Sequence, residues 1–552
     1  MIAAGLAAAA IGLLVLIAGR LHLMLHLFQL EHYEPARLLV WVRRRRARTD
    51  WTMVGFLVVA GAILTAFTAA ELDGLVLSLG SGIGVALAVT GVRLIRRPQT
   101  KPLVFTPRAR RLFGVALAIP ALALAIVAVA VAAGVPAWVA PLAGTLIGLV
   151  ALVFAPEHLF TANTVLQPVQ AADNRRFVQR AVRRLAEIDP LVIGITGSFG
   201  KTTTKACVAE VAELRGPAYA TPASFNSYLG VVRAINEGLT AKHREFVVEM
   251  GAYRRGDIAE LCELVEPRIG VLTAIGPAHL ERFGSLDETE RAKGELAESL
   301  PADGVYVTSA DDERCLRTTE RTPARVVLFS TAGAEEAELT ARDLTMAEGT
   351  TRFVLQRRGG EQAAVRTKLL GRHNVANLLA AAAVGVSMDL PLDAVARALA
   401  RVTPPAHRLA PIINRQAGIV VIDDAYNSNP VGAAAALEVL ASHQAERRLL
   451  VTPGMVELGE REAEENERFG TQAAAVCDLV VLVGEERSRP ILAGLDAASY
   501  PSSQVHVVAN TAEAQELLAK TTRRGDVVLF ENDLPDLYAE GDNGAGSIFP
   551  RP

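Results

Sequence analysis

A glycine-rich turn that ends in a lysine and three threonines is the segment of this chain best suited to chemistry. It reads Gly194-Ile-Thr-Gly-Ser-Phe-Gly-Lys-Thr-Thr-Thr204, with an apolar run at 191–195 leading into it and a helix-compatible segment at 202–214. Such a turn directs backbone N–H groups and the positive end of a helix toward an anion, which is how proteins hold nucleotide phosphates. The pattern therefore predicts a nucleotide-binding loop; the alternative is a plain glycine turn with a surface lysine.

Each residue of this loop has an expected role. The common P-loop spacing would need a glycine at position 195, where the chain has Ile195, so the working core is the shorter Gly197-x-x-Gly200-Lys201-Thr202. Lys201 is expected to reach the outer phosphates, and the Thr202 hydroxyl is expected to ligate Mg²⁺. The other residues expected to surround the phosphates are Gly197, Ser198, Gly200 and Thr203.

Further polar residues could complete such a site. Glu249 ends an apolar run in Val247-Val-Glu-Met-Gly251, where a carboxylate beside a phosphate loop suits Mg²⁺; a solvated glutamate is the alternative. His279, in Ala274-Ile-Gly-Pro-Ala-His-Leu-Glu281, and Lys293, in Arg291-Ala-Lys-Gly-Glu-Leu296, would by themselves be interpreted as a structural histidine and a surface lysine.

Two segments rich in asparagine are also candidates. Asn374 and Asn377, in Gly371-Arg-His-Asn-Val-Ala-Asn377, share one helical face and suit either an adenine or a helix cap. Asp423-Asp-Ala-Tyr-Asn-Ser-Asn-Pro430 closes an apolar strand. Loop residues at the carboxyl end of a strand often line a site, although Asx turns use the same residue types.

The elements that must position these residues follow an α/β pattern. Apolar strands alternate with helical segments, which predicts a mostly parallel sheet covered by helices; these strands are expected at 191–195, 246–249, 269–273 and 305–308. A β-rich region with a hairpin turn at Gly359-Gly360 covers 326–369, and an alanine-rich helical region covers 371–399. A second α/β unit begins after Thr403-Pro-Pro405, with strands expected at 419–423, 449–452, 479–483, 505–508 and 527–530.

The first 155 residues have a different character, and they account for the positive mean hydropathy of +0.28. Five apolar segments are each about long enough to cross a membrane as a helix, at 2–19, 51–70, 75–95, 112–133 and 137–154. Arg20 is expected to end the first of them. Residues 21–42 mix histidines and charges with large apolar residues, which is typical of an interfacial amphipathic helix.

The charged loops between these segments predict their orientation. Arginines at 43–48 lie between the first two segments, and seven Lys or Arg residues at 93–111 lie between the third and fourth, whereas the other two connections carry neither. The positive-inside rule then places the N-terminus outside and everything after Phe154 in the cytoplasm. These loops could in addition hold anionic lipid.

Charge and cysteine content exclude several other classes of protein. The net charge of −3 and the pI of about 6.4 give no overall bias toward nucleic acid. The four cysteines form no CxxC pair, so a disulfide framework or a zinc site is not expected, which suits a reducing cytosol.

At its motifs the chain resembles the Mur ligase family, the ATP-dependent amide-bond-forming enzymes of cell-wall precursor synthesis. The resemblance runs from about residue 191 to residue 528, and eight motifs follow in the family's order. Within the family, Asp-Asp-x-Tyr-Asn-x-Asn-Pro most resembles the members that add D-alanyl-D-alanine to a muramyl tripeptide. The motifs are Thr196-Gly-Ser-Phe-Gly-Lys-Thr-Thr203, Ser224-Phe-Asn-Ser-Tyr-Leu-Gly230, Glu249-Met-Gly251, Gly276-Pro-Ala-His-Leu-Glu281, Ala292-Lys-Gly-Glu295, Gly371-Arg-His-Asn374, His407-Arg408 and the segment 423–430.

The resemblance implies roles that single residues could not establish. Thr202 and Glu249 would hold one Mg²⁺, while His279 and a carbamylated Lys293 would serve a second. Arg408 would contact the γ-phosphate, and Asp424 would lie on the ribose side of ATP. Asn374 and Asn377 would approach the adenine. The residues expected to contact the substrates are Asn226, Tyr426, Asn427 and Asn429, and the catalytic group would be Lys201, His279, Lys293 and Arg408.

The apolar segments and the resemblance together imply a domain organisation. An α-helical membrane domain (1–155) and a connector (156–181) would precede an α/β P-loop central Mur ligase domain (182–402). A Rossmann-like C-terminal Mur ligase domain (403–540) and a flexible tail (541–552) would follow. The enzyme would lie in the bacterial inner membrane with its catalytic domains in the cytoplasm.

Two departures from the family pattern bear on the substrates. The membrane segment stands where soluble members carry a domain that holds UDP, so a lipid-linked muramyl peptide becomes an alternative to a nucleotide-linked one. The last strand continues as Leu529-Phe-Glu-Asn-Asp533 rather than into Lys-Gly-Ser, which leaves the incoming amino acid or dipeptide open. The alternatives to peptidoglycan precursor synthesis are another envelope polymer such as poly-γ-glutamate, and a transporter or sensor driven by a P-loop ATPase.

Overall fold

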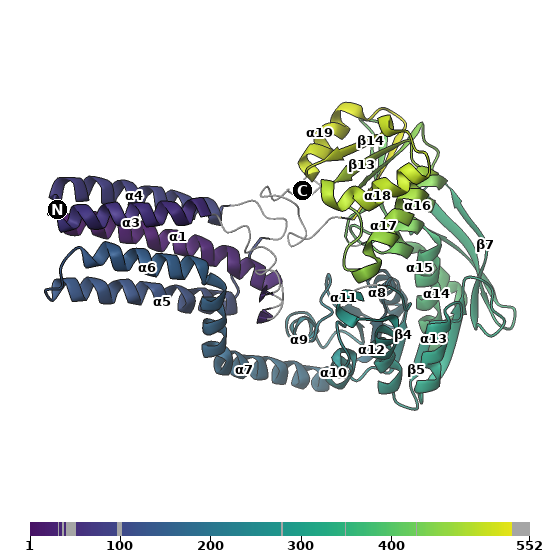
Figure 1. The fold of residues 1–552 in the computed structure, drawn as a ribbon. Helices are drawn as coiled ribbons and strands as arrows, with labels where there is room; N and C mark the ends of the chain where they lie inside the picture. Colours follow the sequence, from purple (N-terminus) through teal and green to yellow (C-terminus); the bar gives the residue numbers. More distant parts are fainter. Residues whose placement is uncertain are drawn as a thin grey trace. The chain divides into compact units, whose positions relative to one another are not determined.

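The computed structural model describes residues 1–30, 33–35, 38–39, 51–96, 102–277, 280–347, 349–426 and 428–532. Their contacts divide the chain into two units, one from Met1 to Asn174 and one beginning at Arg175. The first unit is built from helices, and the second holds two α/β sheets (Figure 1).

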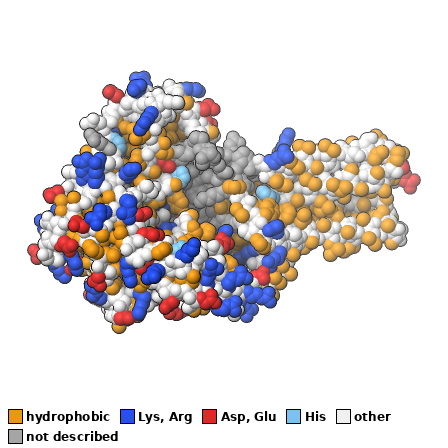
Figure 2. All heavy atoms as spheres, turned by 180° about the vertical axis from the view of Figure 1, so that it is seen from behind, with side chains coloured by type: hydrophobic (Ala, Val, Ile, Leu, Met, Phe, Trp, Pro, Cys, Tyr) orange, Lys and Arg blue, Asp and Glu red, His pale blue; other side chains and the backbone are white. Residues whose placement is uncertain are grey.

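The helical unit has a core of its own, and its outer surface is apolar. Leu16, Ile17, Leu25 and Phe28 are fully buried between its helices. Large side chains that face outward are hydrophobic as well, and they gather over this unit in Figure 2. The helices are α1 (Ile2–Leu30), α3 (Trp51–Ala69), α4 (Asp73–Ile95), α5 (Pro107–Ala132), α6 (Val139–Val153) and α7 (Ala155–Ile188), the last of which continues into the second unit.

Four of these helices, α1, α3, α4 and α5, are long and apolar enough to cross a membrane, and α6 together with α7 gives a fifth if this pair, bent by 77°, counts as one span. The expectation that Arg20 ends the first helix is wrong, because α1 continues without a break to Leu30. His22 and His26 are buried in the bundle, beside the core residues Leu21 and Leu25. Most of residues 31–42 and the arginines at 43–48 lie outside the described residues.

Glycines bring α1 and α4 into close contact. Gly5, Gly12 and Gly19 recur every seven residues and therefore lie on one face of α1, opposite the α4 backbone at Val76, Gly84 and Gly91. A Cβ atom on Gly12 would come within 2.7 Å of the Gly84 carbonyl carbon, so only glycine allows this approach. Small residues at such crossings let two backbones pack by van der Waals contact.

Replacing Gly12 with leucine is expected to separate α1 from α4 and to lower the stability of the bundle by about 1–3 kcal/mol or more, because overpacking forces backbone shifts. Thermal unfolding of the detergent-solubilised protein measures the effect. Gly82→Leu on α4 is the matched control, since a Cβ at Gly82 meets nothing within 4 Å. Equal melting temperatures for the two variants would contradict the close approach.

The second unit begins with a nine-stranded sheet in the order β2-β3-β1-β4-β5-β6-β7-β8-β9. Strands β2 to β6 pair in parallel, whereas β7, β8 and β9 pair antiparallel with one another. The strands are β1 (Leu191–Thr196), β2 (Ala218–Ala220), β3 (Glu245–Glu249), β4 (Ile269–Leu272), β5 (Val305–Ser309), β6 (Arg325–Ser330), β7 (Leu339–Ala347), β8 (Thr350–Arg357) and β9 (Gln362–Thr367).

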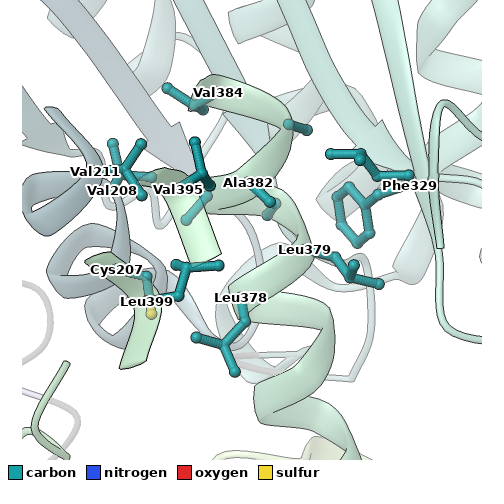
Figure 3. Close-up of a cluster of buried hydrophobic side chains, with 14 of the residues drawn as sticks. Cys207, Val208, Val211, Phe329, Leu378, Leu379, Ala382, Val384, Val395 and Leu399 are labelled. Carbon is teal, nitrogen blue, oxygen red and sulfur yellow. The ribbon is translucent and has the colours of Figure 1, made fainter. Parts of the chain in front are cut away.

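Helices cover both faces of this sheet. On one face, α8 (Lys201–Ala212), α14 (Arg372–Ser387) and α15 (Leu392–Arg401) interdigitate. Figure 3 shows Val208 and Val211 of α8 beside Val395 of α15, and Cys207 of α8 near Leu399 of α15 and Leu378 of α14. The other face is covered by α9 (Tyr228–Glu237), α10 (Asp257–Val265) and α12 (Leu286–Ser299). The shorter helices are α11 (Leu280–Phe283) and α13 (Glu313–Thr318).

A six-stranded sheet follows, in the order β10-β11-β15-β12-β13-β14, parallel except for β10. Its strands are β10 (Ala410–Asn414), β11 (Ile419–Asp424), β12 (Arg447–Thr452), β13 (Leu479–Val483), β14 (Val505–Val508) and β15 (Asp526–Glu531). Helices α16 (Pro430–Ser442), α17 (Glu462–Ala474) and α18 (Glu485–Ala497) share one core, and α19 (Thr511–Thr521) packs into a second core.

The strands expected from apolar runs are all present within two residues of their expected bounds. The hairpin at Gly359-Gly360 is confirmed, because it joins the antiparallel strands β8 and β9 and both glycines have positive φ. The helical region at 371–399 is in fact two helices, since α14 ends at Ser387 and Pro391 caps the start of α15. Strands β2 and β10 were not predicted.

Candidate active site

The glycine-rich turn lies between β1 and α8, and its backbone has the shape of a phosphate-binding loop. Gly197 and Gly200 have φ of +145° and +77°, and a Cβ on either would collide with the Thr273 hydroxyl or the Asn377 amide. The Ser198 hydroxyl accepts a hydrogen bond from the Gly276 amide at 3.0 Å. Left-handed residues turn successive N–H groups toward one side, so the loop fits an anion such as a nucleotide phosphate.

Lys201 lies over this loop. Its Nζ donates to the Gly197 carbonyl at 2.7 Å and to the Ser198 carbonyl at 3.3 Å. Burial lowers the pKa of Lys201 to about 8; Glu249 opposes the shift and Arg408 adds to it. Thr202 follows at the first turn of α8 and is half-buried, whereas Thr203 is buried.

Glu249 lies at the carboxyl end of β3, next to β1, as expected from the sequence. Its Oε1 accepts from Asn226 Nδ2 at 3.0 Å, and its Oε2 lies 2.9 Å from Lys205 Nζ. Burial alone would raise the pKa of Glu249, but Lys205 and Lys201 outweigh burial and hold the pKa below its usual value. Sequence reasoning did not identify Lys205, whose only sequence signal is its place one helical turn after Lys201.

Helix α12 brings Lys293 close to the phosphate loop. A cavity of about 30 Å³ is lined by residues of the phosphate loop, of the loops after β2 and β3, and of α11 and α12; they are Gly197, Ser198, Lys201, Asn226, Gly251, Ala252, Tyr253, Phe283 and Lys293. Lys293 is 2% exposed, and its ammonium lies 5.4 Å from the centre of the Phe283 ring. Burial, and then the charge of Lys201, hold the pKa of Lys293 well below its usual range.

Asn374 and Asn377 are buried against the P-loop helix. The Asn377 amide donates to Asn374 Oδ1 at 2.9 Å, and its own oxygen accepts from the Thr204 hydroxyl at 3.0 Å. Asn374 donates to the Leu370 carbonyl. The two side chains share one helical face, as predicted, and in this arrangement they join α14 to α8 beside Gly200.

Arg408 comes from the start of the six-stranded sheet, and two strained residues flank it. His407 and Leu409 have φ of +59° and +47°, a conformation that L residues adopt at a cost and that persists when neighbours hold it. The neighbours are carboxylates: Asp423 Oδ2 lies 2.8 Å from His407 Nδ1, and Asp424 Oδ1 accepts from the Leu409 amide at 3.1 Å. Asp424 is thus tied to the turn that presents Arg408.

Arg408 also interacts with groups in both sheets. Its guanidinium lies 4.3 Å from the centre of the Tyr426 ring. Its charge acts on Lys201 and His373 and lowers the pKa of Asp424, which burial nevertheless raises to about 7. The Arg408 guanidinium is therefore close enough to the phosphate loop for its charge to act on Lys201.

The remaining predicted site residues are a helix cap, an exposed tyrosine and two residues outside the described part of the chain. Asn429 caps α16, since its side-chain oxygen accepts from the Gly432 amide at 2.9 Å; this is the Asx arrangement left open as the alternative. Tyr426 is exposed. His279 and Asn427 lie outside the described residues.

Acidic side chains end two adjacent strands of the six-stranded sheet, and a threonine ends the next strand. Asp424 of β11 pairs with Glu531 of β15, and Thr452 ends the neighbouring β12. Glu531 is 1% exposed and accepts hydrogen bonds from the Ser428 and Thr452 hydroxyls. Burial raises the pKa of Glu531 to about 8; the charge of Asp424 contributes to this rise, and the hydrogen bonds from Ser428 and Thr452 oppose it.

This raised pKa predicts how stability depends on pH. Above about pH 4.3 the unfolded chain releases the Glu531 proton, while the folded state keeps it until about pH 8, so Glu531 makes stability fall as pH rises through this window. Between pH 5 and pH 8, the melting temperature of the wild type should fall by roughly 5 °C more than that of Glu531→Gln. Parallel curves for the two proteins would contradict an acid kept neutral by burial.

The residues present fit one hard cation. Glu249 offers a carboxylate and Thr202 a hydroxyl beside the phosphate loop, which are ligands that Mg²⁺ accepts. Within the part of the chain that the structure describes, no group of three or more His, Cys, Asp and Glu side chains could hold a metal by itself. A Lys293 ammonium is no metal ligand unless it is converted into an anionic oxygen ligand.

Comparisons with known proteins agree with this geometry. Residues 195–385 match the family model of the Mur ligase middle domain, and residues 407–531 match that of the Mur ligase, glutamate ligase domain. The UDP-N-acetylmuramoyl-tripeptide--D-alanyl-D-alanine ligase of Mycobacterium tuberculosis is 36% identical over 363 residues, which is 62% of this chain and 70% of the relative. The enzyme of the same name from Escherichia coli is 34% identical over 301 residues, 54% of this chain and 66% of the relative.

Solved structures give the same result. The crystal structure of MurF from Acinetobacter baumannii superimposes with a TM-score of 0.59 at 26% identity, over 66% of this chain and 78% of that chain. MurF ligase from Thermotoga maritima in complex with ADP gives a TM-score of 0.58 at 25% identity, over 66% and 81%. The chain therefore belongs to the Mur ligase family. It is an ATP-dependent acid–amino-acid ligase, with a MurF-like α/β fold in its second unit.

Proposed function

We propose that this protein adds D-alanyl-D-alanine to a UDP-N-acetylmuramoyl tripeptide from a catalytic unit anchored in the membrane. One observation carries the proposal: Lys201, Asn226 and Lys293, which come from separate segments, line one cavity beside Glu249. The names of the relatives supply the substrates.

The site suits a reaction in two steps. The terminal carboxylate of the tripeptide attacks the γ-phosphate of ATP, which gives an acyl phosphate and ADP. The amine of the dipeptide then displaces phosphate and forms the amide. Phosphorylation is needed because a free carboxylate is a poor electrophile. Lys201 and Arg408 would stabilise the charge that develops on the transferred group. Because Arg408 belongs to the second sheet, we propose that domain closure completes the site.

Metal ions would be held by residues already described. Thr202 and Glu249 would hold one Mg²⁺, and a carbamylated Lys293 together with His279 would hold a second. Mg²⁺ would neutralise phosphate charge. The low pKa of Lys293 supports carbamylation, because only the unprotonated amine adds CO₂; the product is an anionic carbamate, and one proton is released. Asn374, Asn377 and Asp424 remain proposed contacts of the nucleoside, and Asn226, Tyr426, Asn427 and Asn429 of the substrates.

The helical unit would be the anchor. Helices α1, α3, α4 and α5 and the bent pair α6–α7 would provide up to five spans. The basic loops favour a cytoplasmic catalytic unit, where ATP is. We propose the domain bounds 1–155, 156–181, 182–402, 403–540 and 541–552. The bacterial inner (plasma) membrane is the proposed location.

A second candidate differs only in its substrates. The chain continues as Glu531-Asn-Asp533 where the members that add D-alanyl-D-alanine continue into Lys-Gly-Ser, and an acidic segment at this place would suit a different amine. The alternative acyl substrate is a lipid-linked muramyl peptide or another envelope polymer such as poly-γ-glutamate, because the apolar segments stand where soluble members carry the domain that holds UDP. A transporter or sensor role is not proposed, since the family forms amide bonds.

Phosphate release by the detergent-purified protein tests both candidates. D-alanyl-D-alanine is supplied with either the UDP-linked muramyl tripeptide or its lipid-linked counterpart, and mass spectrometry identifies the product. Turnover with the UDP form is the expected result. Turnover with the lipid form alone would assign substrate binding to the helical unit. If neither substrate supports phosphate release while ATP still binds, the D-alanyl-D-alanine assignment is overturned and other amines must be tested.

A further inference from the structure

A second lysine of the P-loop helix is buried beside the candidate site. Lys205 lies one turn after Lys201 on α8, and its side chain is 7% exposed. A buried ammonium is costly unless it is paired and hydrogen-bonded. Lys205 Nζ has two partners: Glu249 Oε2 at 2.9 Å and the Ala223 carbonyl at 2.6 Å. One partner is the expected metal ligand, and the other belongs to the loop after β2.

That loop carries the expected substrate contact and is strained. Ala223 has φ of +45°, which a residue with a Cβ adopts only when its surroundings hold it there. Three residues later, Asn226 donates from Nδ2 to Glu249 Oε1 at 3.0 Å, and its carbonyl accepts from the Gly251 amide at 2.7 Å. Lys205, Ala223, Asn226 and Glu249 thus form a closed ring of contacts among α8, the loop and β3.

The negative charge of Glu249 could be neutralised without all of these contacts. An ion pair with Glu249 would compensate the buried charge by itself, whereas the bond to Ala223 holds a strained backbone in place. Asn226 lines the cavity that also contains Lys201 and Lys293. A lysine with both bonds therefore fixes the loop relative to the carboxylate.

We propose that Lys205 is a positioning residue that holds the loop 223–226 in a fixed position relative to the carboxylate of Glu249. The acyl substrate bound by the loop and the metal ligand would then keep a fixed position relative to each other. The inference rests on the proposed function for the roles of Asn226 and Glu249. It adds a residue that touches neither ATP nor the substrate, and it predicts that loop position and carboxylate position change together.

Lys205→Met tests the coupling, because methionine fills a similar volume without the charge or the donors. The Gly251 amide reports docking of the loop, since it donates to Asn226. Hydrogen exchange at this amide should accelerate about tenfold or more in the variant. The KM for the muramyl tripeptide should rise about tenfold, while the Kd for ATP measured without Mg²⁺ should change by less than about twofold. Lys242→Met is the control, since Lys242 is exposed.

A double variant separates positioning from charge neutralisation. Removing one partner of a buried ion pair can unfold a protein, whereas Lys205→Met with Glu249→Gln leaves no uncompensated charge. If Lys205 positions the loop, exchange at Gly251 stays fast in the double variant, because the bond to Ala223 is still missing. Recovery of wild-type exchange would overturn the proposal, as would wild-type exchange and KM in a folded Lys205→Met protein.

The exchange measurement needs no turnover. A wild-type protein without ligase activity would contradict the proposed function, yet the exchange rates would still decide whether Lys205 holds the loop.

Discussion

Replacing Lys201 with methionine is expected to reduce ATP-dependent ligation by about a thousandfold, the effect of removing one preorganised donor to developing charge. The Lys201 ammonium already lies at the phosphate loop, within hydrogen-bond distance of the Gly197 and Ser198 carbonyls. Methionine keeps the length of the side chain and removes the positive charge. Phosphate release with saturating substrates measures kcat, and isothermal titration measures ATP binding.

The control for this prediction is Lys368→Met, which removes an exposed lysine after β9. We expect wild-type kcat from this variant and an unchanged fold from both proteins by circular dichroism. A Lys201→Met enzyme that keeps more than about a tenth of the wild-type kcat would show that the lysine does not stabilise phosphoryl transfer. The glycine turn would then have only a structural role.

Replacing Lys293 with methionine is expected to cause a comparable loss of activity through a different step. Lys293 is buried in the cavity that Lys201 and Asn226 also line, and it cannot serve a cation as an ammonium. Burial lowers the pKa of Lys293, which increases the fraction of neutral amine that can add CO₂. The loss of the carbamate would remove a proposed ligand of the second Mg²⁺ and should lower kcat by at least about a hundredfold.

Carbamylation can be observed without turnover. The protein is equilibrated with ¹³C-labelled bicarbonate, and its carbonyl resonances are recorded by NMR. A carbamate resonance is expected in the wild type and in Lys242→Met, but not in Lys293→Met. An active wild-type enzyme without this resonance would leave Lys293 as a buried amine, and the proposed second metal site would need another ligand.

Much of the fold followed from local patterns. Strand β13 begins and ends where its apolar run does, because a buried parallel strand is a continuous hydrophobic run. Strand β2 has three residues, and β10 lies at a sheet edge with its last three residues exposed, so neither stands out in sequence. Helix α1 extends past Arg20, and His22 and His26 are buried in the bundle. A hydropathy pattern does not reveal which polar side chains other helices will cover.

The order of motifs was sufficient to identify the family. Eight short segments in a fixed order are specific even when each alone is ambiguous, and the family and its class of reaction are now shown by the matched models and relatives. The glycines of the phosphate loop could also be interpreted from sequence, since a Gly-Lys-Thr turn after a strand depends on local backbone geometry.

Only the tertiary structure decided which side chains work together. Lys205 reaches Glu249 and Ala223 because α8, β3 and the loop after β2 converge, and nothing in the spacing of residues 205, 223 and 249 indicates this. The strain on both sides of Arg408 is likewise held by Asp423 and Asp424 from another strand. Burial and neighbouring charges set the pKa values of Lys293 and Glu531. A sequence specifies such groups, but their energies depend on neighbours that only the folded chain brings near.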